Sequence, residues 1–414
     1  MLRDASASVV LICVAFYCGL KDVSATENTN ELSNQTLFVM EGLRNYSIEL
    51  LYHTKVVQTE VQNIVVSPFI ILTAIAAVYE GATGRTKSEI KRTLPLINNT
   101  DDARQSFKEI QKMLKADYSA GVFDKINVMF IDYQKFALAE FRDNAKEYYE
   151  TDMVSFNLID SLKAVDVLNA AVVNITNGRI KSVVERSYFD NASIVLTSAV
   201  RFKGQWTVPF NKTYTTKESF YDNNGNKIGE VNMMFNRYTY PFANIKSLQA
   251  RVIEIPYGIE KQFSMLIMLP YPKVSLEKMF RNFASVALST FFDILKSSQE
   301  EYADDEVDCY IPRFKTESII DMKSVLNRMG IHNLFDMKEA RLHLVARMPV
   351  YVSKAIQKAE IEVTEDGIAE TEAGFSHQIG AVRFEANRPF FYMVLEKVTN
   401  SIIFGGFYNE PSFY

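Results

Sequence analysis

The side chains best suited to metal binding and nucleophilic catalysis are few in this chain and scattered along it. Of 414 residues, four are histidine and three are cysteine. They lack the HExxH and CxxC spacings of zinc sites, and no G-x-S-x-G nucleophile elbow is present. A Ser–His–Asp triad is assembled in space, so spacing alone neither supports nor excludes one. We expect no enzyme, no metal and no cofactor; the histidines are His53, His332, His343 and His377.

The most informative segment runs from Glu365 to Gly374. It reads Glu-Asp-Gly-Ile-Ala-Glu-Thr-Glu-Ala-Gly, follows a strand-like run over 350–364, and precedes the apolar run 384–394. Strand side chains alternate between the two faces of a sheet. Because small, apolar and acidic residues are interleaved here, the role of the segment depends on whether it stays in solvent or joins a sheet.

Predicted helices precede most predicted strands, which favours an α+β fold over repeated βαβ units. Apolar periodicity predicts helices over 40–60, 68–81, 101–118, 138–150, 163–176 and 276–296. Strands are predicted over 127–131 and 194–202, within 213–268 around a turn at 223–225, and in a C-terminal hairpin of 390–396 and 402–408.

Local signals mark several helix ends. Ser67 precedes Pro68 as an N-cap, and Asp321 caps a helix that Gly330 closes. The run from Thr86 to Glu89 has the pattern of a capping box that opens a further helix. The acidic run over 300–308 predicts a solvated loop in preference to a binding patch.

Bulk composition favours one large globular unit. The chain is 48% hydrophobic and 23% charged, with a net charge of −5 and no long single-sign block. That distribution predicts no binding to nucleic acid or acidic lipid. Length alone favours two domains, but no repeat, linker or composition break divides the chain. We therefore predict a single domain over 26–414.

The first 25 residues have the pattern of a signal peptide. Arg3 is followed by a largely apolar run over 9–20 and by Val23-Ser24-Ala25, which fits a small-residue cleavage site before Thr26. The alternative is a membrane anchor, but twelve residues are too few to span a bilayer. We expect a secreted, extracellular protein that is not held in a membrane.

Secretion would leave Cys309 as the one cysteine of the mature chain, since Cys13 and Cys18 lie in the removed segment. No intrachain disulfide is then possible, and Cys309 is expected to be a small buried hydrophobe. Six Asn-x-Ser/Thr sequons are candidate glycosylation sites, at Asn34, Asn45, Asn98, Asn174, Asn191 and Asn211.

From about residue 40 to residue 411 the chain resembles the serpin family, because several of its motifs occur in the family's order. The resemblance implies about nine helices around three β-sheets with an exposed reactive-centre loop. The motifs are Asn63-Ile-Val-Val-Ser-Pro-Phe69, Gly81-Ala-Thr-Gly84-x-Thr86-x-x-Glu89-Ile90, Thr176-Asn-Gly-Arg-Ile180, Phe202-Lys-Gly-Gln-Trp206, Ile311-Pro-Arg-Phe314, Val325 to Phe335, and the segments 365–374 and 384–394.

In the family, a protease cleaves the loop, which then inserts into the main sheet as a new strand and traps the protease. The resemblance makes Gly367 the fifteenth residue before the scissile bond, so Ile368, Glu370, Glu372 and Gly374 would point into the core. Burying two unpaired glutamates costs several kcal/mol each or forces their protonation. The hinge of this loop comprises Glu365, Asp366, Gly367, Ile368, Ala369, Glu370, Thr371 and Glu372.

Loop length is a second departure from the inhibitory pattern. Only 21 residues separate Gly367 from Pro389, a few fewer than in inhibitory relatives. Counting forward from Gly367 places the scissile bond at Ala381–Val382, whereas counting back from Pro389 places it within Phe375 to Gln378. Neither position offers Lys or Arg, so an elastase- or chymotrypsin-like protease fits better than a trypsin-like one.

The resemblance also locates the polar groups that govern sheet opening. One such group is the shutter, the polar cluster beneath the main sheet. There Ser67 and Pro68 are kept, while Ser198 and Gln357 replace the family's Asn and His. The changed pair either alters the opening equilibrium or forms a working substitute. At the breach, Trp206 is kept and Arg313 is expected to pair with Glu365.

Together these features predict a secreted, monomeric serpin that has lost protease trapping. It would act as a substrate, a carrier or an interaction protein for an unidentified protein or ligand. The alternative is a suicide-substrate inhibitor of an elastase- or chymotrypsin-like serine protease.

Overall fold

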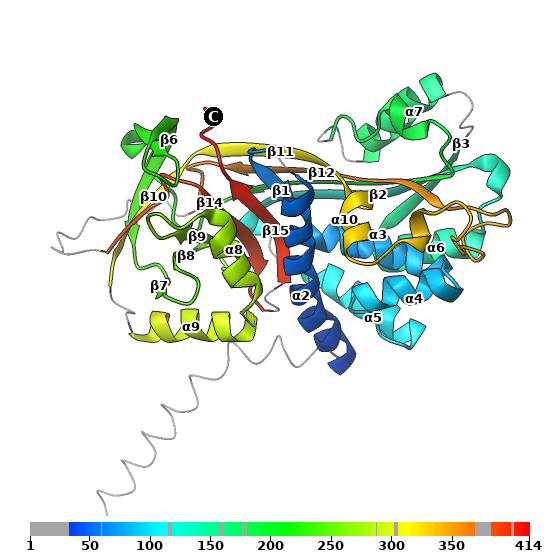
Figure 1. Cartoon of the computed structure of the whole chain (residues 1–414), viewed down its shortest axis with the longest axis horizontal. Helices are drawn as coiled ribbons and strands as arrows, with labels where there is room; N and C mark the ends of the chain where they lie inside the picture. The colour runs from blue at the N-terminus through cyan, green and yellow to red at the C-terminus, as the bar shows by residue number, and fades with distance from the viewer. Residues whose placement is uncertain are drawn as a thin grey trace, which may run out of the picture.

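Three β-sheets with helices packed against them form the computed structural model of this chain (Figure 1). Within the described residues there are nine α-helices, so the predicted α+β class is confirmed. The structure describes residues 33–58, 60–114, 118–156, 161–175, 178, 180–286, 288–301, 305–368, 382–398 and 401–414.

Most helices lie near the predicted ranges. α3 begins at Pro68 and ends at Gly81, and twelve of its fourteen residues are buried, as its all-round apolar sequence requires. The other helices are α2 (Asn34–Val57), α4 (Gly84–Thr93), α5 (Thr100–Leu114), α6 (Ala139–Tyr149), α7 (Ser161–Ile175), α8 (Leu276–Ala284), α9 (Leu288–Glu301) and α10 (Met322–Arg328).

The five-stranded sheet matters most for function, because the loop hinge follows the end of one of its strands. Its strand order is β11 (Phe314–Asp321), β12 (Val352–Val363), β4 (Ile194–Gly204), β2 (Gly121–Asp132) and β3 (Thr151–Phe156). β12 and β4 are neighbours and run parallel, with Glu362 opposite Lys203. Parallel neighbours need a long crossover, and here that crossover carries more than a hundred residues of the chain.

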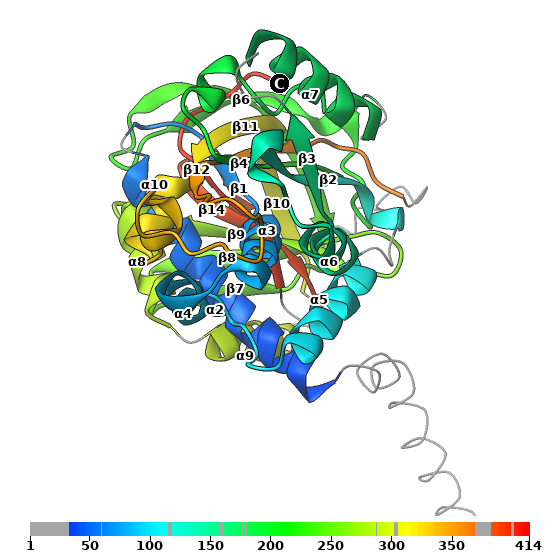
Figure 2. The same cartoon turned by 90° about the vertical axis from the view of Figure 1, so that its right-hand side faces the viewer.

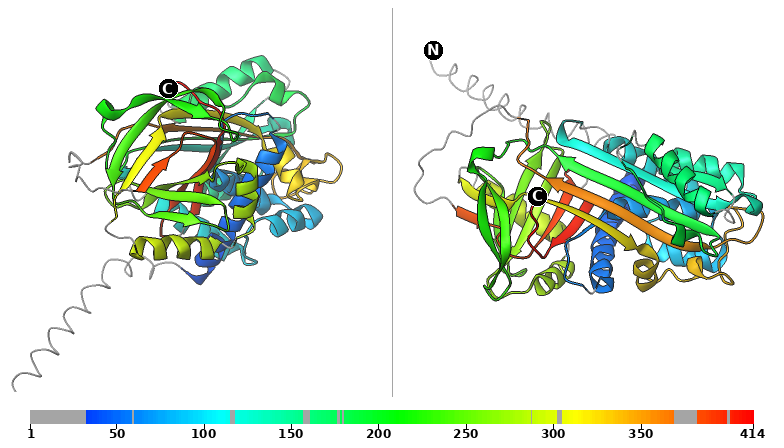
Figure 3. Two further views of the ribbon diagram at one scale, coloured as in Figure 1. Left: turned by 60° about the vertical axis from the view of Figure 1, so that its left-hand side comes forward. Right: turned by 90° about the horizontal axis from the view of Figure 1, so that it is seen from above.

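Two further sheets complete the fold, and the four-stranded one stands at one end of the long strands (Figure 3). Its order is β13 (Val382–Glu385), β10 (Val307–Pro312), β6 (Lys227–Tyr238) and β5 (Thr216–Tyr221). The six-stranded sheet has the order β1 (Ile64–Val66), β15 (Ser401–Tyr408), β14 (Phe390–Glu396), β9 (Phe263–Pro270), β8 (Ala250–Tyr257) and β7 (Phe242–Ile245).

The five-stranded sheet is covered on both faces (Figures 1 and 2). On the outer face lies α7, whose Val172 joins a cluster with Val128, Phe130 and Val195 of the sheet. On the inner face lie α3 and the main core, in which Phe202 packs with Phe404 of β15. The alternation of buried residues along β4 therefore fills two separate apolar layers.

One predicted helix is wrong: the range 276–296 is two helices, α8 and α9, with a break between Ala284 and Leu288. The Ser285 hydroxyl donates to the Asn282 carbonyl at 2.7 Å and so competes with the helical ladder. Phe283 and Phe291 lie on the two helices with ring centroids 5.3 Å apart. Their spacing continues across the break, so apolar periodicity could not reveal it.

The predicted capping box over Thr86 to Glu89 is also wrong. α4 begins at Gly84, so Thr86 lies inside the helix. The Thr86 hydroxyl instead accepts from the Arg341 amide at 3.0 Å. The Glu89 carboxylate accepts from the amides of His332 and Asn333 at 2.9 and 2.7 Å. Both side chains that the local pattern assigned to a helix cap therefore accept hydrogen bonds from distant backbone amides instead.

Two further expectations need correction. Ser67 occupies the N-cap position of α3, but its hydroxyl donates to the Ile403 carbonyl at 2.6 Å and caps nothing. The acidic run over 300–308 is not all loop, because α9 extends to Glu301 and Asp308 lies in β10. Asp308 accepts from Arg237 at 2.5 Å, so it serves strand pairing between β10 and β6.

Candidate functional site: the loop hinge and the strand seam beside it

The described part of the hinge, residues 365–368, follows the end of β12 and is fixed first by Glu365. This side chain is 2% exposed, so its carboxylate needs partners. Arg313 Nη1 lies 3.3 Å from Glu365 Oε1, and the Thr215 hydroxyl donates to the same oxygen at 2.8 Å. The Phe210 amide donates to the Glu365 carbonyl at 3.0 Å. Two separate segments, the one over 210–215 and the one that carries Arg313, therefore hold this residue.

Gly367 lies against backbone that leaves no room for a side chain. A Cβ there would stand 2.7 Å from the Trp206 carbonyl oxygen and 2.8 Å from Pro209 Cα. The amide of Ile368 donates to that same Trp206 oxygen at 3.0 Å, and the amide of Trp206 donates to the Asp366 carbonyl at 3.0 Å. Glycine is required here because the hinge pairs directly with the chain at Trp206.

Trp206 anchors this end of the sheet. It is 1% exposed, and its ring stacks on Tyr257 with centroids 4.2 Å apart. Its indole Nε1 donates to the Thr364 carbonyl at 2.7 Å, which satisfies a buried donor. The single tryptophan of the chain thus ties the hinge to the apolar core.

Asp366 is held by two lysines from different segments. Lys203 Nζ lies 3.3 Å and Lys212 Nζ lies 3.2 Å from its carboxylate oxygens. Burial raises the pKa of Asp366, but hydrogen bonds from Lys212, Thr364 and Lys203 together lower it by more. The pKa of Asp366 therefore lies below its ordinary value. The hinge therefore carries a stabilised negative charge between two cations.

The seam, which we define as the pairing of β4 with β12, carries a row of ion pairs on its outer face. Arg201 Nε contacts Glu360 at 2.8 Å, and Arg201 Nη2 contacts Glu362 at 3.2 Å. Lys203 Nζ contacts Glu362 at 2.8 Å. The cations stand on β4 and the carboxylates on β12, so every one of these contacts crosses the seam.

Beneath the seam, Gln357 binds the start of α3. It is fully buried; its Oε1 accepts from the Ser67 amide at 2.8 Å, and its Nε2 donates to the Ser67 carbonyl at 2.9 Å. One side-chain amide thus satisfies both backbone groups of Ser67. Pro68, the first residue of α3, has no amide proton to satisfy there.

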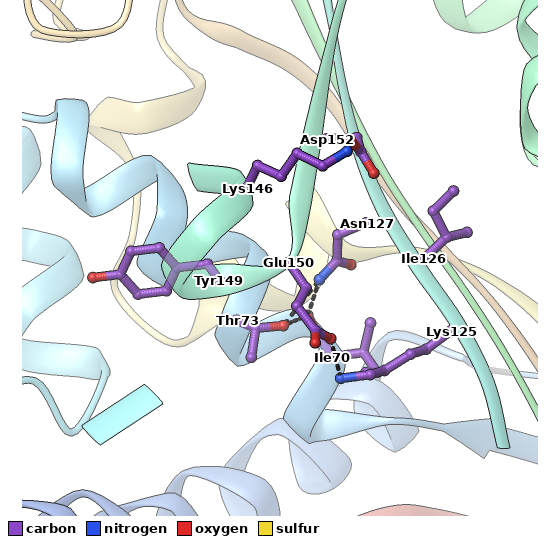
Figure 4. A pocket seen from close by; sticks show the side chains of 9 residues that line it. All are labelled: Ile70, Thr73, Lys125, Ile126, Asn127, Lys146, Tyr149, Glu150 and Asp152. Atoms are coloured by element: carbon purple, nitrogen blue, oxygen red, sulfur yellow. Dashed lines mark hydrogen bonds and ion pairs between the residues drawn. The ribbon is translucent and has the colours of Figure 1, made fainter. Parts of the chain in front are cut away.

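The other shutter position, Ser198, binds a different partner. Its hydroxyl donates to Asn127 Oδ1 at 2.6 Å, and Asn127 Nδ2 donates to the Thr73 hydroxyl at 2.9 Å. Asn127 and Thr73 line a pocket together with Lys125 and Glu150, which form an ion pair 2.6 Å long (Figure 4). The polar cluster therefore has two halves, one on β12 and one on β2 and β4.

A family model described as serpin (serine protease inhibitor) matches residues 41–411. The chain is a serpin. Human Serpin B3 is 28% identical over 372 residues, covering 84% of this chain and 94% of the relative. Leukocyte elastase inhibitor of Xenopus laevis is 28% identical over 357 residues, covering 84% and 93%. Both alignments therefore include most of this chain and nearly the full length of each relative.

Solved structures show the same fold. Serpin-12 of Manduca sexta has a TM-score of 0.77 at 22% identity, covering 89% of this chain and 99% of that one. Maspin has a TM-score of 0.79 at 22% identity, covering 92% and 100%. The expected serpin fold, with its three sheets, is thereby confirmed.

The structure brings Trp206, Arg313 and Glu365 together, and it brings Ser67 to Gln357. It does not join Ser198 to that second pair, because Asn127 takes its hydroxyl. Hinge residues 369–372 and the scissile-bond candidates 375–378 and Ala381 lie outside the described residues. Val382 is the first residue of β13 and is 39% exposed.

Sequence reasoning missed the seam cations Arg201 and Lys203 and their partners Glu360 and Glu362. A period-two row of like charges on each of two strands was the available signal, but it needs the register of β4 against β12. All six sequon asparagines are exposed in the structure.

Other kinds of site are not found in the part of this serpin that the structure describes. No group of three or more His, Cys, Asp or Glu side chains there is placed to hold a metal ion. No helix among those residues is long and apolar enough to cross a bilayer. Cys309 is buried and unpaired, and burial raises the pKa of its thiol, which disfavours the reactive thiolate.

The seam should weaken on acidification through Glu362. Burial raises the pKa of Glu362, but hydrogen bonds from Lys203 and Tyr414 and nearby positive charge lower it more, to below its ordinary 4.5. A depressed carboxylate pKa stabilises the fold above the ordinary value and loses that contribution as pH falls through the folded value. Glu362→Gln should therefore show a smaller loss of unfolding free energy from about pH 5 to pH 3. Urea titrations at both pH values measure it.

The matched control is Glu339→Gln, which changes an exposed glutamate. Its acid-induced loss should equal that of the unchanged protein. Equal losses for Glu362→Gln and Glu339→Gln would contradict a stabilising role for Glu362 at the seam.

Proposed function

We propose that this serpin is a secreted protein that displays its reactive-centre loop without inserting it. It acts as a protease substrate, a carrier or an interaction protein, and does not trap proteases. The observation that carries the proposal is a mismatch between the loop and both faces of the seam. Insertion would place a new strand between β4 and β12, so the mismatch can be argued face by face.

On the outer face, insertion would separate Arg201 and Lys203 from their carboxylates. Adjacent strands lie about 4.8 Å apart, so a strand placed between β4 and β12 would move them to about 10 Å. By the two-residue period, the outward residues of the inserted segment are Ala369, Thr371 and Ala373. None of them carries a charge that replaces the lost partners. The side chains of these pairs are 7–31% exposed, and ion pairs near the surface are worth about 0.2–1 kcal/mol each.

On the inner face, the penalty is larger. The inward residues after Ile368 are Glu370 and Glu372, and the inner face of β4 lines the main core at Val200 and Phe202. Burial of each unpaired glutamate costs several kcal/mol. The two glutamates therefore outweigh the seam pairs, and both effects act against insertion.

A second candidate function is inhibition of an elastase- or chymotrypsin-like serine protease. The intact breach favours it, because Trp206 and the Arg313–Glu365 pair are both present. A relative named leukocyte elastase inhibitor supports the elastase class. The nominal scissile residues Ala381 and Phe375 suit such proteases. In that case the loop would insert despite its glutamates.

Incubation of the mature serpin with elastase, chymotrypsin, trypsin and subtilisin separates the two functions. We expect cleavage with turnover and no covalent complex on a denaturing gel, since fast insertion is what preserves the acyl-enzyme. An inhibitory serpin treated with the same proteases controls for their activity. A complex that survives boiling in detergent would establish trapping and overturn the main proposal.

A further inference from the structure

A single short segment, residues 206–215, contacts the hinge through hydrogen bonds and an ion pair. Its Phe210 amide donates to the Glu365 carbonyl at 3.0 Å, and its Thr215 hydroxyl donates to the Glu365 carboxylate at 2.8 Å. Its Lys212 pairs with Asp366 at 3.2 Å. Anything attached to this segment therefore stands beside the first residues of the loop.

Asn211 lies in the middle of this segment and begins the sequon Asn211-Lys212-Thr213. It is exposed, and it forms the N-cap of the short turn Lys212–Tyr214. Its Oδ1 accepts from the Thr213 amide at 2.9 Å and from the Thr213 hydroxyl at 2.7 Å. The turn thus uses the oxygen of the side-chain amide, whereas a glycan attaches to the nitrogen.

We propose that Asn211 carries an N-linked glycan that covers the hinge and limits protease access to the chain that follows Ile368. The glycan is bulky and solvated. It grows from the residue between Phe210 and Lys212, both of which contact the hinge. The inference rests on the secretion included in the proposed function, because N-glycans are added in the secretory pathway.

The position of Asn211 distinguishes it from the other sequons. Asn34 and Asn45 lie on α2, Asn98 follows α4, and Asn174 lies on α7. Asn191 precedes β4, whereas Trp206 follows that strand. The eleven residues of β4 separate these ends by about 35 Å at 3.3 Å per residue. A glycan at Asn191 is therefore a control that leaves the hinge uncovered.

The test uses the full chain secreted from cells that add N-glycans. Mass spectrometry gives the occupancy of each sequon, and limiting subtilisin gives the rate of cleavage in the chain after Ile368. The variants Asn211→Asp and Asn191→Asp each remove one sequon. Aspartate keeps the side-chain oxygen of the Asn211 turn and tolerates the left-handed backbone at Asn191, whose φ is 54°.

We expect a glycan on Asn211 and cleavage of Asn211→Asp several times faster than that of the unchanged protein. Asn191→Asp should be cleaved at the unchanged rate. The same three proteins made without glycans should be cleaved at equal rates, which separates the glycan from the added charge of aspartate.

Two results would overturn the inference alone: an unoccupied Asn211 in protein glycosylated elsewhere, or equal cleavage rates for the two glycosylated variants. Retention inside the cell, without glycans at any sequon, would overturn the proposed secretion and this inference with it. Trapping of a protease by the glycosylated protein would contradict the proposed function but leave the Asn211 result standing.

Discussion

Replacement of Gln357 by alanine is expected to lower the free energy of unfolding by about 2–5 kcal/mol. The reason is that this buried side chain satisfies both the amide and the carbonyl of Ser67. Alanine would leave two buried backbone groups without partners and a cavity where the side chain stood. Urea unfolding followed by far-UV circular dichroism measures the change.

The matched control is Gln134→Ala, which removes an exposed glutamine and should change stability by less than about 0.5 kcal/mol. A loss below about 1 kcal/mol for Gln357→Ala would mean that Gln357 is not a working substitute for the histidine expected from the family. The shutter would then depend mainly on the cluster of Asn127, Thr73 and Ser198.

The second large effect is a gain of function. Combining Glu370→Ala and Glu372→Ala with Glu360→Gln and Glu362→Gln should make the cleaved protein more stable than the intact one. The changes remove two charges from the inward face of an inserted strand and weaken the ion pairs that span the closed seam. Relief of several kcal/mol predicts a rise in melting temperature after cleavage of at least about 5 °C.

The control variant for this experiment is Glu300→Ala with Glu301→Ala, which matches the two Glu→Ala changes of the loop but places them at the exposed end of α9. Its cleaved and intact forms should melt alike. If the fourfold variant also melts alike before and after cleavage, charge is not the barrier. Loop length, with 21 residues between Gly367 and Pro389, would then be the remaining obstacle, and lengthening the loop in the same variant would test it.

Much of the hinge could be predicted from sequence because its signals are local. Gly367 follows two acidic residues at the end of a strand-like run, and the close approach of Trp206 explains why glycine stands there. The partner of Glu365 was also predictable, since Arg313 lies at a motif position of the family. Each of these residues can be identified from its own position in the sequence, without knowing which strands pair.

The seam and half of the shutter could not be predicted, because they depend on pairing between distant segments. Arg201 and Glu360 are 159 residues apart, and they meet only through the register of two parallel strands. Asn127 has no local signal that sets it apart from other strand residues. The break between α8 and α9 was hidden for the opposite reason, since its apolar spacing is uninterrupted while Ser285 ends the first helix.

The most direct test of the central claim compares the melting temperature of the unchanged serpin before and after a single cut between residues 374 and 383. The display of the loop without insertion predicts the same melting temperature for both forms, because the seam of β4 and β12 stays closed. A sharp rise in the melting temperature of the cut form would show that the loop had inserted and would contradict the account.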